Sequence, residues 1–521
     1  NYQNAHPHSN GQVAVVHNGI IENAGKLKNN LKLSGFEFKS DEDSDSEVFL
    51  GLITMEMAKG LDLKRAMINS FLKIEGNSAF VVQNKDSDEI YAVKRGNPLV
   101  CGVREDTEEI SVSSDPYALM GMANKVYFPD DMTLCCLQKD MGLRFFDMDG
   151  NESKKYQIRR QNMNLTPAKK GTYEHFMLKE IYEQPELVRS LRDFYSTGEG
   201  RLCLQRIQEI TPDRVYIIAC GTAYFAGLCI RNYLESLSAI PCVVEFASEF
   251  RYKKSLFKKG DVALFISQSG ETADTLAAQK LCKENGLKTL SIVNVEGSTL
   301  FRDCDANLPI CAGTEIGVAS TKAFSLMVLV GRLLAQAWKD KSDVDLYKQF
   351  DVLADRMEVL LTDADSIKSI AENLYQHKAF FYTGRGQYYP IALEGALKLK
   401  EIAYVHAEGY AAGELKHGPI ALIEKQVVNM AIIGPELFHK AFSNMQEIKA
   451  RRGIIVGIGP RGNEDMQRES DFYIPLDFTN LDGLSPVYVN VVGQLFAYYL
   501  AYFKGTDIDR PRNLAKSVTV E

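Results

Sequence analysis

Hydroxyl-bearing side chains gather in one short segment, Ser267-Gln-Ser-Gly-Glu-Thr272. The segment follows an apolar run at 262–266 and precedes a helix-like pattern, so its backbone N–H groups are expected at the positive end of a helix dipole. A single hydroxyl there would be an ordinary helix cap, but this segment has four uncharged polar side chains in six residues. We therefore predict a phosphate-binding loop. The Gly-Lys-Ser/Thr ending of a nucleotide P-loop is absent from it.

A second glycine-containing turn, Cys220-Gly-Thr222, follows the apolar run 215–219. Ligands of open α/β sheets bind beyond the carboxyl ends of the strands, where both turns are expected. We predict that Gly221, Thr222 and the loop at 267–272 share one sugar phosphate. The pair Gly384-Arg-Gly386 lacks the third glycine of a dinucleotide fingerprint, so no nicotinamide cofactor is expected.

Three charged residues, Glu394, Lys398 and Glu401, are spaced i, i+4 and i+7 on a predicted helix and should share a face. Taken alone, this pattern favours a solvent-exposed face with a Glu–Lys pair. His417 lies in the predicted loop 413–419 and, taken alone, is more typical of a surface residue.

The C-terminal segment 510–521 contains Leu514, Val518 and Val520, although chain ends are usually frayed and poor in apolar residues. We expect the segment to pack back onto the protein and to carry Lys516 with it. A lysine amine held in a closed pocket is a candidate for Schiff-base chemistry, whereas an exposed one is not.

Two kinds of element must position these residues. Residues 1–150 alternate short β-rich runs with turns and contain one helix-like stretch at 46–59, which predicts an α+β domain with antiparallel strands. From about residue 213 the pattern changes to buried strand, glycine-containing turn and helix, and it starts again near residue 379. This order predicts two doubly wound parallel sheets, a duplicated α/β unit. The polar stretch 151–172 is interpreted as a linker.

Composition narrows the possible functions. The chain has 521 residues, enough for three or four domains, and a net charge of −8 from 60 basic and 68 acidic residues. The sequence has no dense Lys/Arg run of the kind that would indicate a nucleic-acid partner. It also has no apolar segment long enough for a membrane span. The 10 cysteines show neither zinc spacing nor a disulfide framework, which favours reduced thiols in the cytoplasm. His6-Pro-His8 has no neighbouring ligand cluster, so no metal site is expected.

Seven segments, in this order, resemble the isomerizing glutamine–fructose-6-phosphate aminotransferases, also called glucosamine-6-phosphate synthases. They are His17 to Asn23, Cys220 to Thr222, Ser267 to Thr275, Thr314 to Lys322, Glu394 to Glu401, Glu414 to Pro419, and Asn513 to Glu521. Other sugar isomerase (SIS) proteins are expected to share only the serine-rich loop.

The resemblance implies a fold and a reaction. The expected fold is α/β, with two SIS-type parallel-sheet domains preceded by a partial α+β N-terminal-nucleophile glutaminase domain. The implied boundaries are 1–150 for the glutaminase domain, 151–172 for the linker, 173–368 for the first SIS domain, and 369–521 for the second with its catalytic tail. The implied enzyme converts fructose 6-phosphate and ammonia from glutamine to glucosamine 6-phosphate, the first step towards UDP-N-acetylglucosamine. It would need no cofactor and form a cytoplasmic homodimer through the SIS domains.

The resemblance also implies roles for the site residues. The phosphate would be held by Thr222, Ser267, Gln268, Ser269 and Thr272, and the sugar contacted by Val318 and Ser320. Lys516 would form an imine with the C2 carbonyl, and Glu401 would move a proton between C1 and C2. Lys398 would lie near the C1 hydroxyl, and His417 would assist ring opening from the partner subunit.

The glutaminase part departs from the family pattern at its start. Asn18 and Gly19 would build an oxyanion hole, and His6 and Asp45 would bind glutamine. The family's nucleophile is an N-terminal cysteine, whereas residue 1 here is Asn1. We therefore expect product from ammonium and little or none from glutamine.

Two other functions stay open on the sequence. One is a SIS-type sugar-phosphate isomerase or deaminase that uses free ammonia, and the other is a non-catalytic sugar-phosphate sensor. A sensor would need the 267–272 loop but not Glu401, His417 and Lys516 together, so their joint presence favours catalysis.

Overall fold

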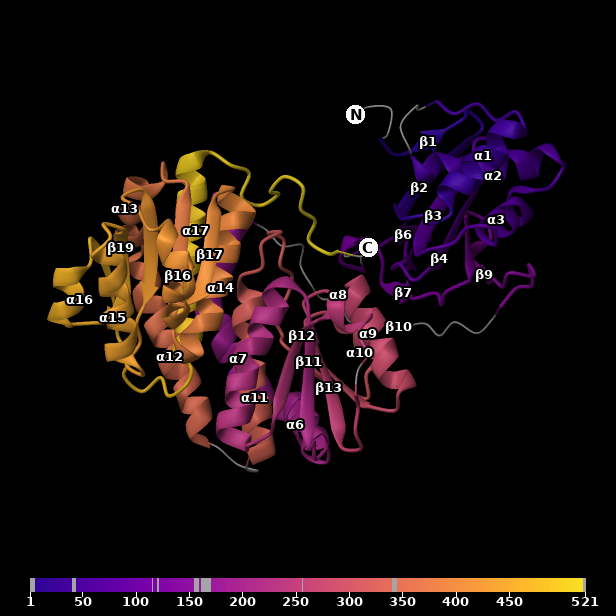
Figure 1. Ribbon diagram of the computed structural model, residues 1–521. Helices are drawn as coiled ribbons and strands as arrows, with labels where there is room; N and C mark the ends of the chain where they lie inside the picture. The colour runs from indigo at the N-terminus through magenta and orange to yellow at the C-terminus, as the bar shows by residue number, and fades with distance from the viewer. Residues whose placement is uncertain are drawn as a thin grey trace. The chain divides into compact units, whose positions relative to one another are not determined.

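The computed structural model describes residues 5–39, 44–114, 116–119, 121–153, 159–160, 170–254, 256–339 and 344–518 (Figure 1). The chain divides into two compact units, residues 1–169 with 518–521, and residues 170–517. Each unit is described by itself below.

The N-terminal unit is an α+β domain with antiparallel strands, as predicted. Its larger sheet has the order β1(His8–Ser9), β2(Val13–Gly19), β3(Ser78–Asn84), β4(Glu89–Arg95), β8(Leu134–Gln138), β9(Gly142–Phe146). A smaller sheet has the order β10(Arg159–Arg160), β7(Lys125–Tyr127), β5(Val100–Arg104), β6(Glu109–Ser113). The helices are α1(Ala24–Leu33), α2(Asp45–Ala58), α3(Leu63–Phe71) and the short η2(Pro116–Leu119). Side chains alternate along β2, and its buried set packs with α2 and α3.

The second unit begins with a parallel five-stranded sheet in the order β12(Cys242–Phe246), β11(Arg214–Ala219), β13(Asp261–Ser267), β14(Lys288–Val293), β15(Ala306–Pro309). Its helices are α4(Phe176–Tyr182), α5(Gln184–Ser196), α6(Gly198–Gln208), α7(Gly221–Ser238), α8(Ala247–Phe250), α9(Ala273–Glu284), α10(Thr299–Asp303), α11(Lys322–Lys339) and α12(Val344–Thr362). Helices α7 and α11 lie on one face of the sheet, and α8, α9 and α10 lie on the other (Figure 1).

A second parallel sheet repeats this arrangement in the order β17(His406–Ala411), β16(Ala379–Gly384), β18(Val427–Ile432), β19(Ile454–Pro460), β20(Phe472–Leu476). Its α-helices are α13(Ala364–Leu374), α14(Tyr389–Lys398), α15(Phe438–Lys449), α16(Glu464–Glu469) and α17(Ser485–Lys504). Shorter helical turns are η3(Gly386–Tyr388), the π-helix η4(Leu399–Ala403), η5(Ala412–His417) and η6(Pro419–Leu422). In both halves the second strand lies at the edge beside the first, so the predicted duplication is confirmed.

Strand β13 shows why these sheets need helices on both faces. All seven of its residues are buried, as expected for a parallel strand covered on both sides. Val262, Leu264 and Ile266 join the core that contains α7 and α11, whereas Ala263 and Phe265 join the core beneath α9. The first of these cores also includes residues of β16, β18, α14 and α17. The two halves therefore share one hydrophobic core.

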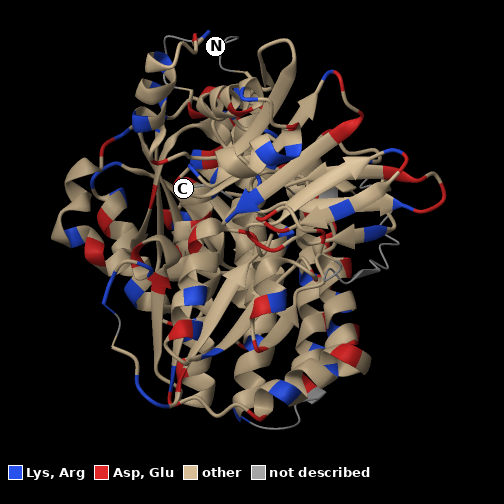
Figure 2. Cartoon of the chain, turned by 90° about the vertical axis from the view of Figure 1, so that its right-hand side faces the viewer, with Lys and Arg blue, Asp and Glu red and all other residues tan. Residues whose placement is uncertain are grey.

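Figure 2 shows Lys/Arg and Asp/Glu interspersed along helices and strands. Among the described residues, no helix combines the length and the apolar character that a membrane span requires.

Candidate functional site

The serine-rich segment forms a tight loop between β13 and α9, at the carboxyl edge of the first sheet. The Gly270 amide donates to Ser267 Oγ at 2.9 Å, and the Glu271 amide donates to Ser269 Oγ at 3.1 Å. Gly270 has φ +67°, and a Cβ there would lie 2.0 Å from the Ser298 hydroxyl oxygen, so the turn requires glycine. The Glu271 carboxylate accepts the Thr299 amide at 2.7 Å. The loop thus presents hydroxyls and the start of α9, while its acidic side chain is bound to another helix start.

The second predicted turn links the two halves of the unit. Gly221 begins α7 with φ +53°, and Cys220 is the N-cap residue. The Thr222 hydroxyl donates to Glu394 Oε1 at 3.2 Å and accepts from Lys398 Nζ at 3.1 Å. The structure therefore brings the first α/β half into contact with the charged residues predicted on α14.

Glu394, Lys398 and Glu401 share one face, as their spacing predicted. Lys398 Nζ lies 3.3 Å from Glu394 Oε1 and 2.6 Å from Glu401 Oε2. The solvent-exposed interpretation is wrong, because the Glu394 and Lys398 side chains are both 0 % exposed. Burial raises the pKa of Glu394 to about 7. Burial alone would lower the pKa of Lys398, but Glu394 and Glu401 more than offset it and raise that pKa.

The helix changes its winding at Glu401. Residues 399–403 form a single π-helical segment, and Tyr404 ends it with φ +54°. Such π-turns occur mostly as single bulges, often at functional sites. The Glu401 side chain is 21 % exposed, in contrast to sealed Lys398. Within this charged group, Glu401 is therefore the carboxylate that a substrate can reach.

Lys516 is held by the loop that follows β15. Its Nζ donates to Glu315 Oε2 at 2.5 Å and to the Gly317 carbonyl at 2.8 Å. The predicted return of the tail to the protein is observed, but the apolar reason given for it is wrong. Leu514 is 46 % and Val518 is 58 % exposed, and Val520 lies outside the described residues. Polar contacts hold the tail, among them the hydrogen bond from the Arg512 amide to Tyr404 Oη at 2.7 Å.

Glu315, which the sequence argument did not single out, is the anchor of the Lys516 amine. Its buried carboxylate also accepts the Thr321 amide at 2.9 Å, the Ala323 amide at 3.1 Å and the Ser320 hydroxyl at 3.2 Å. Burial alone would raise the pKa of Glu315, but Lys516 and these hydrogen bonds hold it down at about 2. The Lys516 ammonium therefore faces a fully ionised carboxylate.

Asp509 fixes the tail to helix α4. Its carboxylate oxygens accept the amides of Phe176 and Met177, each at 2.9 Å, and its carbonyl accepts the Val318 amide at 3.1 Å. The predicted sugar contacts Val318 and Ser320 therefore both lie close to the residues that hold the tail. Val318 donates to Asp509, and Ser320 donates to Glu315, the anchor of Lys516.

Asp509→Ala is expected to destabilise this unit by about 1–2 kcal/mol, because two helix-start amides lose their acceptor. Calorimetric unfolding of the variant checks this, with Asp507→Ala as the control in the same turn. Asp507 accepts one exposed amide, that of Arg510, so its replacement should cost less. Equal melting temperatures for Asp509→Ala and the wild type would contradict the anchoring role.

His417 is a predicted catalytic residue that lies on a separate segment, η5. It lies exposed at the end of η5. Within the described residues it forms no hydrogen bond or ion pair with another predicted site residue.

The predicted glutamine-binding residues His6 and Asp45 are linked through Ser46 in the N-terminal unit, where the Ser46 hydroxyl donates to Asp45 Oδ1 at 3.5 Å. Ser46 Oγ lies 3.0 Å from both His6 Nε2 and His17 Nδ1, and Asp45 Oδ2 accepts the Ile21 amide at 2.9 Å. Burial alone would raise the pKa of Asp45, but His17 and the Ile21 amide lower it overall. An ionised Asp45 suits a ligand with an ammonium group.

Gly19, at the end of β2, has no room for a side chain. Its φ is +142°, and a Cβ would lie 2.3 Å from the Asn77 carbonyl oxygen. The fully buried Asn97 donates to the Asn18 carbonyl at 2.6 Å, and its own Oδ1 has no partner in the described part of the chain. Asn97 was not predicted from the sequence, although the Gly96-Asn97-Pro98 turn is a local signal of a fixed backbone.

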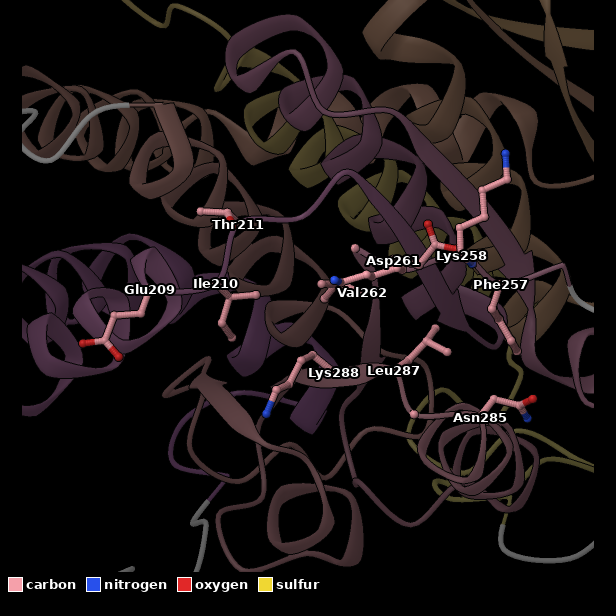
Figure 3. Close-up of a pocket in the computed structure, with 13 residues that line it drawn as sticks. Glu209, Ile210, Thr211, Phe257, Lys258, Asp261, Val262, Asn285, Leu287 and Lys288 are labelled. Atoms are coloured by element: carbon pink, nitrogen blue, oxygen red, sulfur yellow. The ribbon is translucent and has the colours of Figure 1, made fainter.

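A cavity of about 510 Å³ lies away from these groups, at the amino edge of the first sheet. Figure 3 shows Asp261 and Lys288, the first residues of β13 and β14, in its lining. The candidate site residue Ser267 ends β13 at the opposite edge, where ligands of parallel sheets bind. The cavity is therefore separate from the candidate site. Among the described residues, no group of three or more His, Cys, Asp or Glu side chains could hold a metal ion.

Two family models match the chain. The SIS domain model matches residues 210–337 and again residues 373–504. The glutamine amidotransferase domain model matches residues 2–121.

Curated relatives match almost the whole chain. A glutamine–fructose-6-phosphate aminotransferase [isomerizing] of Clostridium acetobutylicum is 40% identical over 534 residues, which cover 99% of this chain and 86% of that protein. The protein of the same name from Escherichia coli is 39% identical over 539 residues, with the same coverage.

Solved structures match about two thirds of the chain. The C-terminal domain of the glucosamine-fructose-6-phosphate aminotransferase of Francisella tularensis has a TM-score of 0.60 and 37% identity, and covers 66% of this chain and 100% of that one. A glucosamine-6-phosphate deaminase of Thermotoga maritima has a TM-score of 0.55 at 24% identity, covering 67% of this chain and 100% of its own, and is similar in fold.

Proposed function

We propose, because the chain belongs to the family of isomerizing glutamine–fructose-6-phosphate aminotransferases, that it converts fructose 6-phosphate and ammonia to glucosamine 6-phosphate. The observation that carries the proposal is the Lys516 amine, anchored on Glu315 and Gly317, on a tail that also contacts the residue ending the π-turn of Glu401. The tail that bears Lys516 is hydrogen-bonded to Tyr404, directly after that turn. A nucleophile and an acid–base group on adjoining segments are what imine-based isomerisation needs.

The phosphate is assigned to the carboxyl edge of the first sheet. The groups that bind it are Gly221, Thr222, Ser267, Gln268, Ser269 and Thr272. Thr222 contributes its backbone amide, since its hydroxyl already bridges Lys398 and Glu394 and the first amides of a helix have no intrahelical partner. Val318 and Ser320 border the sugar.

Lys516 attacks the C2 carbonyl of the open-chain sugar, and the resulting imine makes the C1 hydrogen acidic. Water leaves as the C=N bond replaces C=O, and ammonia then attacks C2 and displaces the Lys516 amine, so that C2 carries the ammonia nitrogen as an imine. Glu401 then takes a proton from C1 and returns one to C2, while Lys398 holds Glu401 and lies near the C1 hydroxyl. His417 assists ring opening from the partner subunit of a homodimer, in keeping with its exposure in the single chain.

The N-terminal unit is assigned to glutamine. His6 and Asp45 bind the amino acid, and Asn18 and Gly19 form the oxyanion hole. We assign residues 1–150 to this domain, 151–172 to the linker, 173–368 to the first SIS domain and 369–521 to the second. The enzyme acts in the cytoplasm without a cofactor, nucleic acid or membrane partner.

The deciding experiment incubates the chain with fructose 6-phosphate and ammonium, so that the SIS half is tested without the glutaminase domain. We expect glucosamine 6-phosphate, identified by mass spectrometry and by enzymatic acetylation. Binding of fructose 6-phosphate without conversion would favour a sensor. If fructose 6-phosphate does not bind, the assignment of the phosphate site to the first sheet is wrong.

A further inference from the structure

Glu180 is a buried acid near Lys516 with no part in the mechanism above. It lies on α4 and is 2 % exposed. Its Oε1 accepts the amides of Ile316 at 2.5 Å and Gly317 at 3.2 Å. The Glu180 carboxyl group is therefore hydrogen-bonded to the loop that holds the Lys516 amine.

Gly317 connects the side chains of Glu180 and Lys516 through its backbone. Its amide donates to Glu180, its carbonyl accepts from Lys516 at 2.8 Å, and the next amide, that of Val318, donates to the Asp509 carbonyl. A Cβ at Gly317 would lie 2.9 Å from Glu180 Oε2. Glu180 therefore lies directly against the backbone that sets the position of the amine's carbonyl acceptor.

The second oxygen of Glu180, Oε2, is buried without a hydrogen-bond partner among the residues that the structure describes, which is unusual for a carboxyl group. An ionised oxygen in that position is costly. Burial and the neighbouring Glu315 raise the pKa of Glu180 to about 7, and Lys516 acts in the opposite direction. When Lys516 loses its positive charge, that opposing influence disappears, so the affinity of Glu180 for a proton must rise.

The charged groups around Glu180 come from three elements. Glu315 lies on the loop after β15 and Lys516 on the C-terminal tail. Asp509, also on the tail, binds the start of α4. At the end of α4, Glu183 is paired with Lys179 and Lys322 and thereby neutralised.

We propose that Glu180 is a positioning residue for Lys516: its Oε1 fixes the backbone of residues 316–317, and its Oε2 takes up a proton when the Lys516 ammonium becomes a neutral nucleophile. An N–H bond on Nζ breaks, an O–H bond on Glu180 forms, and the electron pair stays on Nζ. The inference rests on the proposed function, because it assigns Glu180 a part in imine formation.

Two variants separate the two parts of the role. Glu180→Gln keeps an acceptor for both amides but cannot hold the proton. Glu180→Asp keeps a carboxyl group but is one methylene too short to reach the loop. Glu183→Gln is the matched control, with the same substitution three residues further along. Imine formation on the full chain is followed by trapping with cyanoborohydride and fructose 6-phosphate, and mass spectrometry of the Lys516 peptide.

The rate of trapping is measured at saturating cyanoborohydride, so that imine formation and not the reagent limits it at each pH, and Glu183→Gln should show the wild-type pH profile. For the wild type we expect a rise through pH 7 and a plateau above it, because Glu180 accepts a proton only when ionised. Glu180→Gln should lose this inflection, with kcat lower by about tenfold or more and KM unchanged. Glu180→Asp should keep an inflection but react more slowly.

Each result decides between the inference and its premise. No trapping in the wild type would overturn the proposed function itself. Trapping in the wild type with an unchanged rate and pH profile in Glu180→Gln would overturn the proton role alone. Wild-type kinetics in Glu180→Asp would overturn the positioning role, and this variant decides that point even if Glu180→Gln does not fold.

Discussion

Lys516→Arg is expected to lower glucosamine 6-phosphate formation at least about a thousandfold and to abolish borohydride trapping of the sugar. Arginine keeps a positive charge for the Glu315 carboxylate and the Gly317 carbonyl, which accept from Lys516 at 2.5 and 2.8 Å. Its guanidinium cannot lose a proton in a protein, so it cannot form the imine. The measurement is product formation from fructose 6-phosphate and ammonium, with trapped sugar quantified by mass spectrometry.

The matched control is Lys504→Arg at the end of α17, where the lysine amine donates to the Tyr375 carbonyl. It should keep both activity and trapping. Fructose 6-phosphate should still bind to Lys516→Arg, because the phosphate loop is separate from the tail. Sugar trapped on another lysine of the variant, or turnover near that of the wild type, would refute the assignment of Lys516.

Local signals were sufficient to predict the elements and the loops that end them. The apolar run 262–266 and the following serines predicted β13 and its loop, because both depend on adjacent residues. The spacing of Glu394, Lys398 and Glu401 predicted a shared face for the same reason. Spacing could not predict that this face is buried against Thr222. Thr222 is 172 positions from Glu394 and 176 positions from Lys398 in the sequence.

The anchors of Lys516 depend on contacts between distant parts of the chain. Lys516 and Glu315 are 201 positions apart, and Glu180 and Ile316 are 136 apart. One signal for Glu180 was present in the sequence of α4 and the first residue of α5. Met177, Glu180, Ile181 and Gln184 follow the i, i+3, i+4, i+7 spacing of a buried stripe. An acid in such a stripe requires partners, and those partners are the loop amides.

The tail shows how a correct expectation can rest on a wrong reason. Its apolar residues suggested packing, yet Leu514 and Val518 are exposed. Hydrogen bonds of Asp509, Arg512 and Lys516 hold the segment instead. Polar residues in a tail are ordinarily solvated, so composition gave no sign of these contacts.

Lys398→Met is expected to destabilise the second unit by about 3–5 kcal/mol. Methionine has a volume similar to that of lysine, but it removes the cation from a buried charged group. Glu394 would remain fully buried with the Thr222 hydroxyl as its hydrogen-bond donor. Activity should also fall, since Lys398 holds Glu401 at 2.6 Å. Urea unfolding across pH 5 to 8 measures the change in the free energy of unfolding.

The pH dependence identifies the cause. Burial raises the pKa of Glu394 to about 7 from its ordinary 4.5, so the folded state favours the protonated form and its stability falls as pH rises through that value. Without Lys398 the pKa rises further, and the stability difference from the wild type must grow between pH 5 and pH 8. Adding Glu394→Gln to Lys398→Met removes the ionisable group and should recover most of the loss at pH 8. A loss that is independent of pH, or a double variant no more stable than the single one, would mean that Lys398 contributes through packing and not through its charge.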